Sequence, residues 1–244
     1  MNKYDVFQKM IEESNSIVFF GGAGTSTDCG LPDFRGTNGL YSGEKEKKYA
    51  YPPETKLSHT FNERHTEEFF DLYRNEMIFD WAKPNEFHEK LVALEKSGKL
   101  KAIVTQNIDS LHQKAGSQNV IELHGSTARN YCTCCHKFFD EAFVKNYDGV
   151  PRCDECGAVV KPDVVLYEES LSDASVSNAI RAISQADMLI VAGTSLSVYP
   201  AAMYIDYFTG DNLVIINKQP TPRDKHAELV FAESVTDVFS HLDL

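Results

Sequence analysis

The chain has 244 residues and a formal net charge of −12, with 24 lysines and arginines against 36 acidic residues. This balance argues against binding of nucleic acid or anionic lipid, because a surface that tracks phosphates needs clustered basic residues. No stretch approaches the roughly 18 apolar residues of a membrane span, and the N-terminus lacks the pattern of a secretion signal. We therefore expect a cytoplasmic protein with one large core and a smaller appended module, and no membrane or nucleic-acid partner.

Apolar runs alternate with segments of helical periodicity along most of the chain. Apolar residues recur three or four positions apart in three predicted helices, at 4–13, 86–96 and 173–186. Short apolar runs bounded by turn residues predict strands at 17–20, 102–104, 188–192 and 213–216. Such continuously apolar strands are typical of a parallel sheet that is buried on both faces. The predicted fold class is therefore α/β, a parallel sheet with helices on both faces.

Two regions interrupt this alternation. Residues 37–81 hold a polar, Tyr- and Pro-bearing stretch and then an aromatic-rich helical segment at 67–74, and residues 129–162 are rich in cysteine. Both resemble insertions that form a small module over one end of the sheet. We expect residues 1–36, 82–128 and 163–244 to form the large domain.

Four of the six cysteines form two C-x-x-C pairs, Cys132 with Cys135 and Cys153 with Cys156. Each pair can place two thiolates on one tight turn, so that four sulfurs surround a zinc ion tetrahedrally. Cys134 lies inside the first pair and makes its register ambiguous. Since four protein ligands fill the coordination shell, we predict one structural zinc ion per chain; redox-active or merely buried thiols are the alternative.

A glycine-rich segment follows the first predicted strand. A strand that leads through Gly22 and Gly24 into a helix lets backbone N–H groups approach a pyrophosphate. The spacing is not that of the dinucleotide fingerprint, however, since Thr27 stands at the third glycine's place and Gly30 comes later. From this segment alone, a plain tight turn and a nucleotide-binding loop are both open.

Polar residues also follow three other predicted strands. Thr105–Asp109 comes after the strand at 102–104, Gly193–Ser195 after that at 188–192, and Asn217 ends the last. Ligands bind at the carboxyl ends of parallel strands, so these groups and the glycine loop would surround one crevice.

Together, several motifs resemble the sirtuin family of NAD-dependent protein deacylases, from about residue 6 to residue 240, in the family's order and spacing. The motifs are Gly22-Ala-Gly-Thr-Ser-Thr-Asp-Cys-Gly-Leu-Pro-Asp-Phe-Arg-Gly36, Thr105-Gln-Asn-Ile-Asp109, Leu123-His-Gly125, the cysteine pairs, Lys161-Pro-Asp-Val-Val165 and Gly193-Thr-Ser-Leu-Ser-Val-Tyr-Pro-Ala-Ala202. The resemblance implies a Rossmann-like domain joined to a zinc-ribbon and helical module. NAD and an acyl-lysine peptide would enter the cleft between them from opposite sides.

The resemblance also implies roles for single residues. Those that would contact NAD are Ala23, Thr27, Phe34, Arg35, Gln106, Ile108, Asp109, Thr194, Ser195, Asn217 and Val235. The residues implied in catalysis are Asn107 and His124, and those implied in peptide binding are Val164, Val165 and Tyr167. The peptide would add as a strand along Val164–Tyr167, with Gly193–Val198 on its other flank.

The deacylation implied by the resemblance needs a base that activates a ribose hydroxyl and is mostly neutral at pH 7. Among the side chains, this favours histidine. His124 follows an apolar run and precedes Gly125, at a strand end that would deliver it to the cleft. Five of the eight histidines fall on segments expected to be solvated, namely His59, His65, His88, His226 and His241. His136 adjoins the cysteine motif, and His112 is a candidate for the core or for a supporting position.

The function implied by the resemblance is NAD-dependent lysine deacylation, with transfer of the acyl group to ADP-ribose and release of nicotinamide. The partners would be acyl-lysine proteins or peptides, and the chain would act as a monomer. The alternatives are an NAD-dependent protein mono-ADP-ribosyltransferase and a non-catalytic NAD or ADP-ribose sensor. A hydride-transferring dehydrogenase fits less well because the glycine spacing departs from its fingerprint.

Three departures from family patterns bear on specificity. Tyr167-Glu168-Glu169 stands where the family usually has Phe-Gly-Glu, which adds a carboxylate near the substrate entrance, and Cys29 stands where serine is frequent. The Tyr-x-x-Arg pair of sirtuins that remove acidic acyl groups is absent, since the nearest match reads Phe70-Asp-Leu-Tyr73. We therefore expect acetyl or longer neutral acyl groups as substrates.

Overall fold

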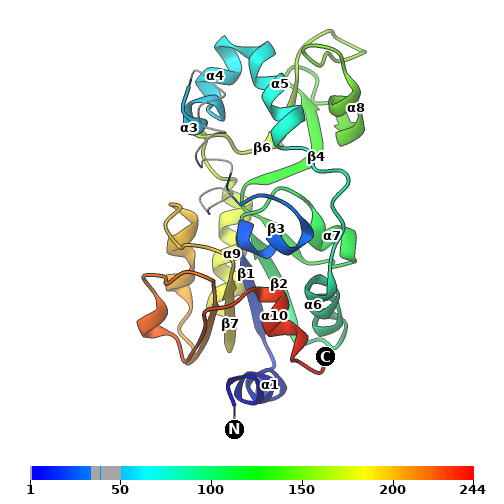
Figure 1. Cartoon of the computed structure of the whole chain (residues 1–244). Coiled ribbons are helices and arrows are strands. Elements are labelled where there is room, and N and C mark those ends of the chain that lie inside the picture. Colours follow the sequence, from blue (N-terminus) through cyan, green and yellow to red (C-terminus); the bar gives the residue numbers. More distant parts are fainter. Residues whose placement is uncertain (1, 34–38, 40–50) are drawn as a thin grey trace.

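The computed structural model describes residues 2–33, 39 and 51–244. Two modules are visible in Figure 1: a parallel sheet flanked by helices, and a smaller module at the end of the molecule opposite both termini. Residues 34–38 and 40–50, which include the end of the expected segment 1–36 and the start of the expected insertion 37–81, lie outside the described residues.

The larger module is built on a six-stranded parallel sheet with the strand order β3-β2-β1-β7-β8-β9. Its strands are β1 (Ile17–Gly21), β2 (Leu100–Thr105), β3 (Val120–Glu122), β7 (Met188–Ala192), β8 (Asn212–Ile216) and β9 (Leu229–Phe231). This is the order of the doubly wound dinucleotide-binding fold, in which the strand order reverses between two central strands. Here the reversal falls between β1 and β7.

Helices cover both faces of this sheet. One face packs against α1 (Lys3–Glu13), α6 (Glu86–Lys96) and α10 (Val235–Ser240), and the other against α9 (Asp173–Ser184) and the 3-10 helix η3 (Ala201–Tyr207). Alternate residues of β1 supply the two cores, with Phe19 on the first face and Phe20 on the second. The predicted α/β class with helices on both faces is confirmed. Short α7 (Leu111–Ala115) lies against α6, and η4 (Asp224–His226) precedes β9.

In its described residues, the small module combines a three-stranded antiparallel sheet with four short helices. The strands are β4 (Gly125–Cys132), β5 (Phe138–Asp140) and β6 (Val160–Val164), in the order β5-β4-β6. The helices are α3 (Pro53–Lys56), α4 (His59–Arg64), α5 (Thr66–Glu76) and α8 (Glu141–Asn146). β4 and β6 span the domain boundaries expected at 128 and 163. Both strands belong to the small sheet: the chain enters this sheet through β4 and leaves it through β6.

Two 3-10 turns, η1 (Ala23–Thr25) and η2 (Thr27–Cys29), follow the glycine loop. One local expectation is wrong. His88, expected on a solvated face, is buried, because its Nδ1 lies 2.7 Å from the Asn85 side-chain oxygen and its ring packs beside Phe87 and His112. His112 is also buried, which confirms a core position.

Within the described part of the chain, none of the helices combines the length and the apolar character needed to cross a bilayer.

Candidate functional site

The loops that follow β1 and β7 meet at the point where the strand order reverses. The Gly24 N–H donates a hydrogen bond to the Gly193 carbonyl at 2.8 Å, and the Gly22 N–H donates to Ala192 at 3.1 Å. In open parallel sheets, this is where the crevice for a ligand forms.

Glycine at these positions permits the contact between the two loops. A Cβ atom on Gly22 would lie 2.8 Å from the Gly193 oxygen, and one on Gly24 would lie 2.7 Å from the Gly193 Cα. The N–H groups of Gly22 and Gly24 are already hydrogen-bonded within the protein. The two glycines therefore serve loop packing, and in this conformation their own N–H groups are not available to a pyrophosphate.

A cleft of about 1500 Å³ extends from these loops to the small module. Thirteen of the residues expected to bind NAD or peptide, or to act in catalysis, line it: Ala23, Thr27, Gln106, Asn107, Ile108, His124, Val164, Val165, Tyr167, Thr194, Ser195, Asn217 and Val235. Phe34 and Arg35, also expected here, lie outside the described residues. A cleft of this size has room for a dinucleotide and an extended peptide together, since drug-sized ligands occupy about 300–1000 Å³.

A smaller cavity of about 40 Å³ adjoins the cleft and is lined by Asn107, Ile108 and Asp109. Ser26 joins two of these side chains: its hydroxyl accepts from the Asn107 amide at 2.9 Å and donates to Asp109 at 2.7 Å. Burial raises the pKa of Asp109, while hydrogen bonds from the Leu111 N–H and the Ser26 hydroxyl oppose this rise. An amide and a carboxyl group are thus fixed beside apolar walls, which suits a flat ring that carries a carboxamide.

Polar side chains along the rest of the cleft are also held in place. The Gln106 amide donates to the Thr194 hydroxyl at 3.2 Å, which links the loops after β2 and β7. The Ser195 and Ser197 hydroxyls lie 2.6 Å apart, and the Asn217 amide donates to the Gln219 carbonyl at 2.7 Å. Thr194, Ser195 and Asn217 line the end of the cleft that faces β7 and β8.

His124 lies between β3 and β4, at the junction of the two modules. Its Nδ1 is 2.7 Å from the Gln106 carbonyl oxygen, which can only accept, so Nδ1 carries the proton and Nε2 is left as a base. Burial lowers the pKa of His124, and the bond to Gln106 opposes the decrease. The next residue, Gly125, has a φ of 73°, and a Cβ atom there would collide with the Asp163 carbonyl. Glycine is therefore needed for the chain to turn directly after His124.

The two cysteine pairs converge on one point of the small module. The sulfurs of Cys132, Cys135, Cys153 and Cys156 all lie within 4.8 Å of one another. The closest approaches are 3.3 Å for Cys132–Cys156 and 3.6 Å for Cys135–Cys153. Four sulfurs at about 2.3 Å from one zinc ion lie at nearly these separations. The N–H groups of residues 134 and 135 donate to the Cys132 sulfur at 3.4 Å. The arrangement can hold one zinc ion, and Cys134 is not part of the cluster.

Residues 22–200 match the Sir2 family. The chain belongs to this family.

The Sir2 relatives span the whole chain. An NAD-dependent protein deacetylase of Clostridium acetobutylicum is 56% identical over 98% of this chain and 97% of its own length. Another, of Clostridium perfringens, is 55% identical over 97% of both. Among solved structures, Sir2 with a p53 peptide and NAD+ has a TM-score of 0.81 at 37% identity, covering 97% of this chain and 95% of that one. Sir2Tm bound to a propionylated peptide has a TM-score of 0.82 at 35% identity, covering 98% and 97%. The expected Rossmann-like fold with a small zinc-ribbon and helical module is confirmed.

Some residues that line the cavities were missed by sequence reasoning. Ser26 was read only as part of a motif, although it connects Asn107 with Asp109. Met77 and Phe79, just after α5, form the wall that the small module contributes to both cavities. Their apolar character at the end of an amphipathic helix was the available signal, but nothing in the sequence directs them to the cleft.

Proposed function

We propose that this Sir2 protein is an NAD-dependent protein deacetylase in which His124 is the general base. The relatives above carry the name of that activity over nearly their full lengths. The observation that supports the proposal most directly is the His124 imidazole in the wall of the cleft, with Nδ1 bonded to Gln106.

NAD, when bound, supplies a ribose carbon that accepts the acyl oxygen as nicotinamide departs. We assign the adenosine and phosphate end of NAD to Thr194, Ser195, Asn217 and Val235, at the ends of β7 and β8 and the start of α10. The nicotinamide carboxamide is assigned to Ile108 and Asp109 at the small cavity, and Asn107 and Gln106 to the neighbouring ribose. Ala23 and Thr27, with Phe34 and Arg35, complete the proposed NAD set.

His124 removes a proton from a ribose hydroxyl in this proposal. Its pKa is lowered by burial, so the imidazole is mostly neutral at pH 7 and Nε2 can accept a proton. The Gln106 carbonyl holds the required tautomer. Activity should therefore fall as pH decreases and Nε2 becomes protonated.

The peptide site lies along the segment that follows β6. Val164, Val165 and Tyr167 line the cleft, but much of their backbone is already paired. The Val165 N–H donates to the His124 backbone carbonyl at 3.0 Å, and the Tyr167 N–H donates to the Leu57 carbonyl at 2.9 Å. The His59 N–H also donates to the Tyr167 carbonyl at 3.0 Å. We therefore assign side-chain contacts with the acyl-lysine to these three residues, and main-chain pairing with the peptide to Glu168, Ser170 and Leu171, which also line the cleft. The Glu169 N–H is already bonded to the Leu166 carbonyl at 3.0 Å.

Acetyl and longer neutral acyl groups are the proposed substrates. The Tyr73 hydroxyl is buried and has no partner among the described residues, and Arg74 is engaged by Asp71 and the Gly149 carbonyl. An acidic acyl group would meet no cation from α5. The Sir2Tm complex holds a propionylated peptide, a neutral acyl group longer than acetyl. A higher kcat/KM for succinyl-lysine than for acetyl-lysine in the same peptide would contradict this assignment.

The decisive experiment incubates the protein with NAD and acetylated peptide, with wild type beside His124→Ala. We expect equal amounts of free lysine peptide, nicotinamide and O-acetyl-ADP-ribose by mass spectrometry. His124→Ala should lower kcat by about 10² to 10⁴ and leave NAD binding in place. Transfer of ADP-ribose onto a protein, with no free lysine peptide, would favour the mono-ADP-ribosyltransferase alternative.

We further propose that the chain acts as a monomer in the cytoplasm on acyl-lysine proteins. The net charge of −12 supports the absence of a nucleic-acid partner. Light scattering during gel filtration tests the oligomeric state; a dimer at micromolar concentration would contradict it.

A further inference from the structure

Glu168 has a backbone conformation that normally favours glycine. Its φ is 75°, in the left-handed region, where a side chain with a Cβ atom is strained and glycine is not. It is one of four non-glycine residues with positive φ in the described part of the chain. A glutamate at this position needs an interaction that compensates for the backbone strain, or a functional role that explains why glycine is not used.

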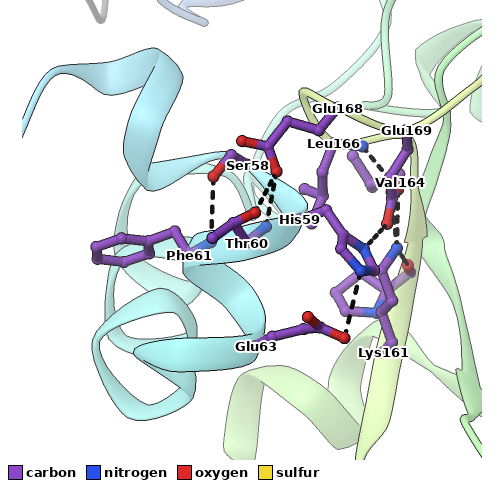
Figure 2. Close-up of polar contacts among 11 residues, drawn as sticks. Ser58, His59, Thr60, Phe61, Glu63, Lys161, Val164, Leu166, Glu168 and Glu169 are labelled. Atoms are coloured by element: carbon purple, nitrogen blue, oxygen red, sulfur yellow. Dashed lines mark hydrogen bonds and ion pairs between the residues drawn. The ribbon is translucent and has the colours of Figure 1, made fainter.

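The Glu168 carboxylate is held by the first turn of α4. Its Oε2 accepts from the Thr60 N–H at 2.9 Å and from the Thr60 hydroxyl at 2.7 Å. Figure 2 shows this side chain reaching across from the strand segment to the helix. Both hydrogen bonds favour the ionised form and lower the pKa of Glu168. A negative charge is therefore fixed in place at neutral pH.

The neighbouring carboxylate, Glu169, differs because cations balance it. Its Oε1 lies 2.9 Å from the His59 Nδ1, and its Oε2 accepts from the Lys161 ammonium at 3.1 Å and the Leu166 N–H at 2.9 Å. Figure 2 places this group on the opposite side of the turn from the Thr60 contact. Among the residues that the structure describes, the Glu168 carboxylate is hydrogen-bonded by the neutral donors of Thr60, and Arg64 and His59 act on it at longer range.

Glu168 also lies where the peptide is proposed to pair. It lines the cleft together with residues 169–171, and within the described chain no backbone hydrogen bond occupies the N–H or carbonyl of Glu168. A peptide strand paired at this edge would carry its side chains past the fixed carboxylate, because paired strands place opposite residues about 5 Å apart.

The other charged residues that line the described part of the cleft are mostly acidic. Among the described lining residues, the carboxylates are Asp33, Glu76, Glu168, Glu169, Asp173 and Glu233, and the one lysine is Lys218. Lys218 is next to Asn217, at the proposed nucleotide end, and lies 3.7 Å from Asp28. The proposed peptide end thus holds the Glu168 and Asp173 carboxylates, whereas Lys161 balances Glu169 and Lys218 lies at the other end. A carboxylate at the peptide end complements a basic residue of a polypeptide.

We propose that Glu168 is a specificity-determining residue that favours acetyl-lysines flanked by lysine or arginine over those flanked by acidic residues. The inference rests on the peptide binding proposed above.

The test compares three peptides of equal length that carry one acetyl-lysine flanked by arginine, alanine or glutamate. For wild type we expect kcat/KM to be about fivefold higher with the arginine peptide than with the glutamate peptide, as for an exposed charge pair. Glu168→Gln keeps an oxygen that can accept from Thr60 but loses the charge, so this ratio should fall to below about twofold. The wild-type ratio should also shrink in 0.5 M salt, where charges are screened beyond about 4 Å.

Two matched variants separate charge from shape. Thr60→Val removes the hydroxyl donor and leaves the Glu168 charge, so it should retain most of the arginine-to-glutamate ratio. Asp148→Asn removes one exposed charge from the small module, outside the cleft lining, and should leave the ratio at the wild-type value. The proposal is overturned if Glu168→Gln keeps the wild-type arginine-to-glutamate ratio of kcat/KM. It is also overturned if this variant lowers kcat/KM equally for all three peptides. If wild type deacetylates none of them, the proposed function itself fails, and this is distinguishable because it does not depend on Glu168.

Discussion

The two modules of this protein are stabilised in different ways. In the sheet module, every residue of β1 and β7 is buried, and apolar side chains pack on both faces. In the small module, β4 mixes buried and partly exposed residues, and the core packs around Cys132 and Cys153. Apolar burial dominates in the first module, whereas metal–thiolate bonds are expected to be essential in the second. We therefore expect different perturbations to disrupt the two modules, and with them the two ends of the cleft.

Cys153→Ser should have the largest effect, because it removes a buried member of the cysteine cluster. A structural zinc site contributes about 10 kcal/mol or more, which is comparable to the whole stability of an ordinary domain. We expect loss of zinc, unfolding of the small module and at least a roughly hundredfold loss of deacetylation. ADP-ribose should still bind to the sheet module, as measured by calorimetry beside metal analysis.

The matched control is Cys134→Ser. Cys134 is exposed and outside the cluster, so this variant should keep one zinc per chain and its activity. Active wild type purified without chelator but with a zinc-to-protein ratio near zero would contradict the prediction. Loss of ADP-ribose binding in Cys153→Ser would show that the modules are not separable in this way.

Gly193→Ala should produce the opposite pattern. Gly193 has a φ of 60°, and a Cβ atom would collide with the Thr25 nitrogen and lie 2.6 Å from the Gly24 carbonyl carbon. Backbone strain and overlap together cost about 2–4 kcal/mol and would separate the two loops. We expect the KM for NAD to rise at least about tenfold, with zinc content unchanged.

Gly98→Ala is the control for this glycine. Its φ of 76° gives similar strain, but nothing lies within 4 Å of the added Cβ atom. It should lower the melting temperature slightly and leave the KM for NAD near the wild-type value. A similar KM change in both variants would mean that strain, and not loop contact, explains the effect of Gly193→Ala.

The sheet module was the more predictable of the two from sequence. Its strands are continuous apolar runs, and the run at 188–192 coincides with β7 because both faces of that strand are buried. The helix predicted at 86–96 coincides with α6 for a similar reason: its apolar residues recur at helical spacing. The cysteine spacing also predicted the sulfur cluster, since two C-x-x-C turns bring four thiols together.

Contacts between distant segments were less predictable. His88 was expected to be solvated, but it packs against His112 from α7, and the local sequence does not indicate this contact. The roles of Gly22 and Gly24 depend on Gly193, which is about 170 residues away along the chain. The contact of Glu168 with Thr60 likewise joins residues 108 positions apart. Such pairings follow from topology, which local periodicity does not specify.

The buried histidines should make the sheet module sensitive to acid. Burial lowers the pKa of His112 to about 3 and that of His88 to about 4, whereas both would titrate near 6.5 in the unfolded chain. Between these values the unfolded state binds more protons, so stability falls as pH decreases below about 6.5. Each histidine should cost about 2 kcal/mol between pH 7 and pH 5.

His112→Leu should reduce this loss by about 2 kcal/mol, measured as the difference between urea unfolding free energies at pH 7 and pH 5. Neither ring nitrogen of His112 has a hydrogen-bond partner among the described residues, so the substitution should be tolerated at pH 7. The exposed His226 provides the control, since His226→Gln should retain the wild-type pH dependence. An unchanged difference in His112→Leu would show that another group controls acid sensitivity.

The smallest effect is expected at the junction of the modules, where Ser26→Ala removes the hydroxyl between Asn107 and Asp109. Among the described residues, Asp109 then keeps the Leu111 N–H as its one donor, and the Asn107 amide keeps the Thr25 hydroxyl as its one acceptor. Both groups remain buried but are less restrained. Loss of a hydrogen bond to a charged group costs about 1.5 kcal/mol. We expect kcat/KM for NAD to fall about tenfold, and inhibition by free nicotinamide to weaken by a similar factor.

Ser14→Ala is the control, because Ser14 is equally buried but bonds to the Met10 carbonyl at the end of α1. It should leave both kinetic constants unchanged. If Ser26→Ala also left them unchanged, the small cavity would not depend on this connection. If Ser26→Ala released zinc as well, the junction would transmit disruption from the sheet module to the small module, and the two modules would not be independent.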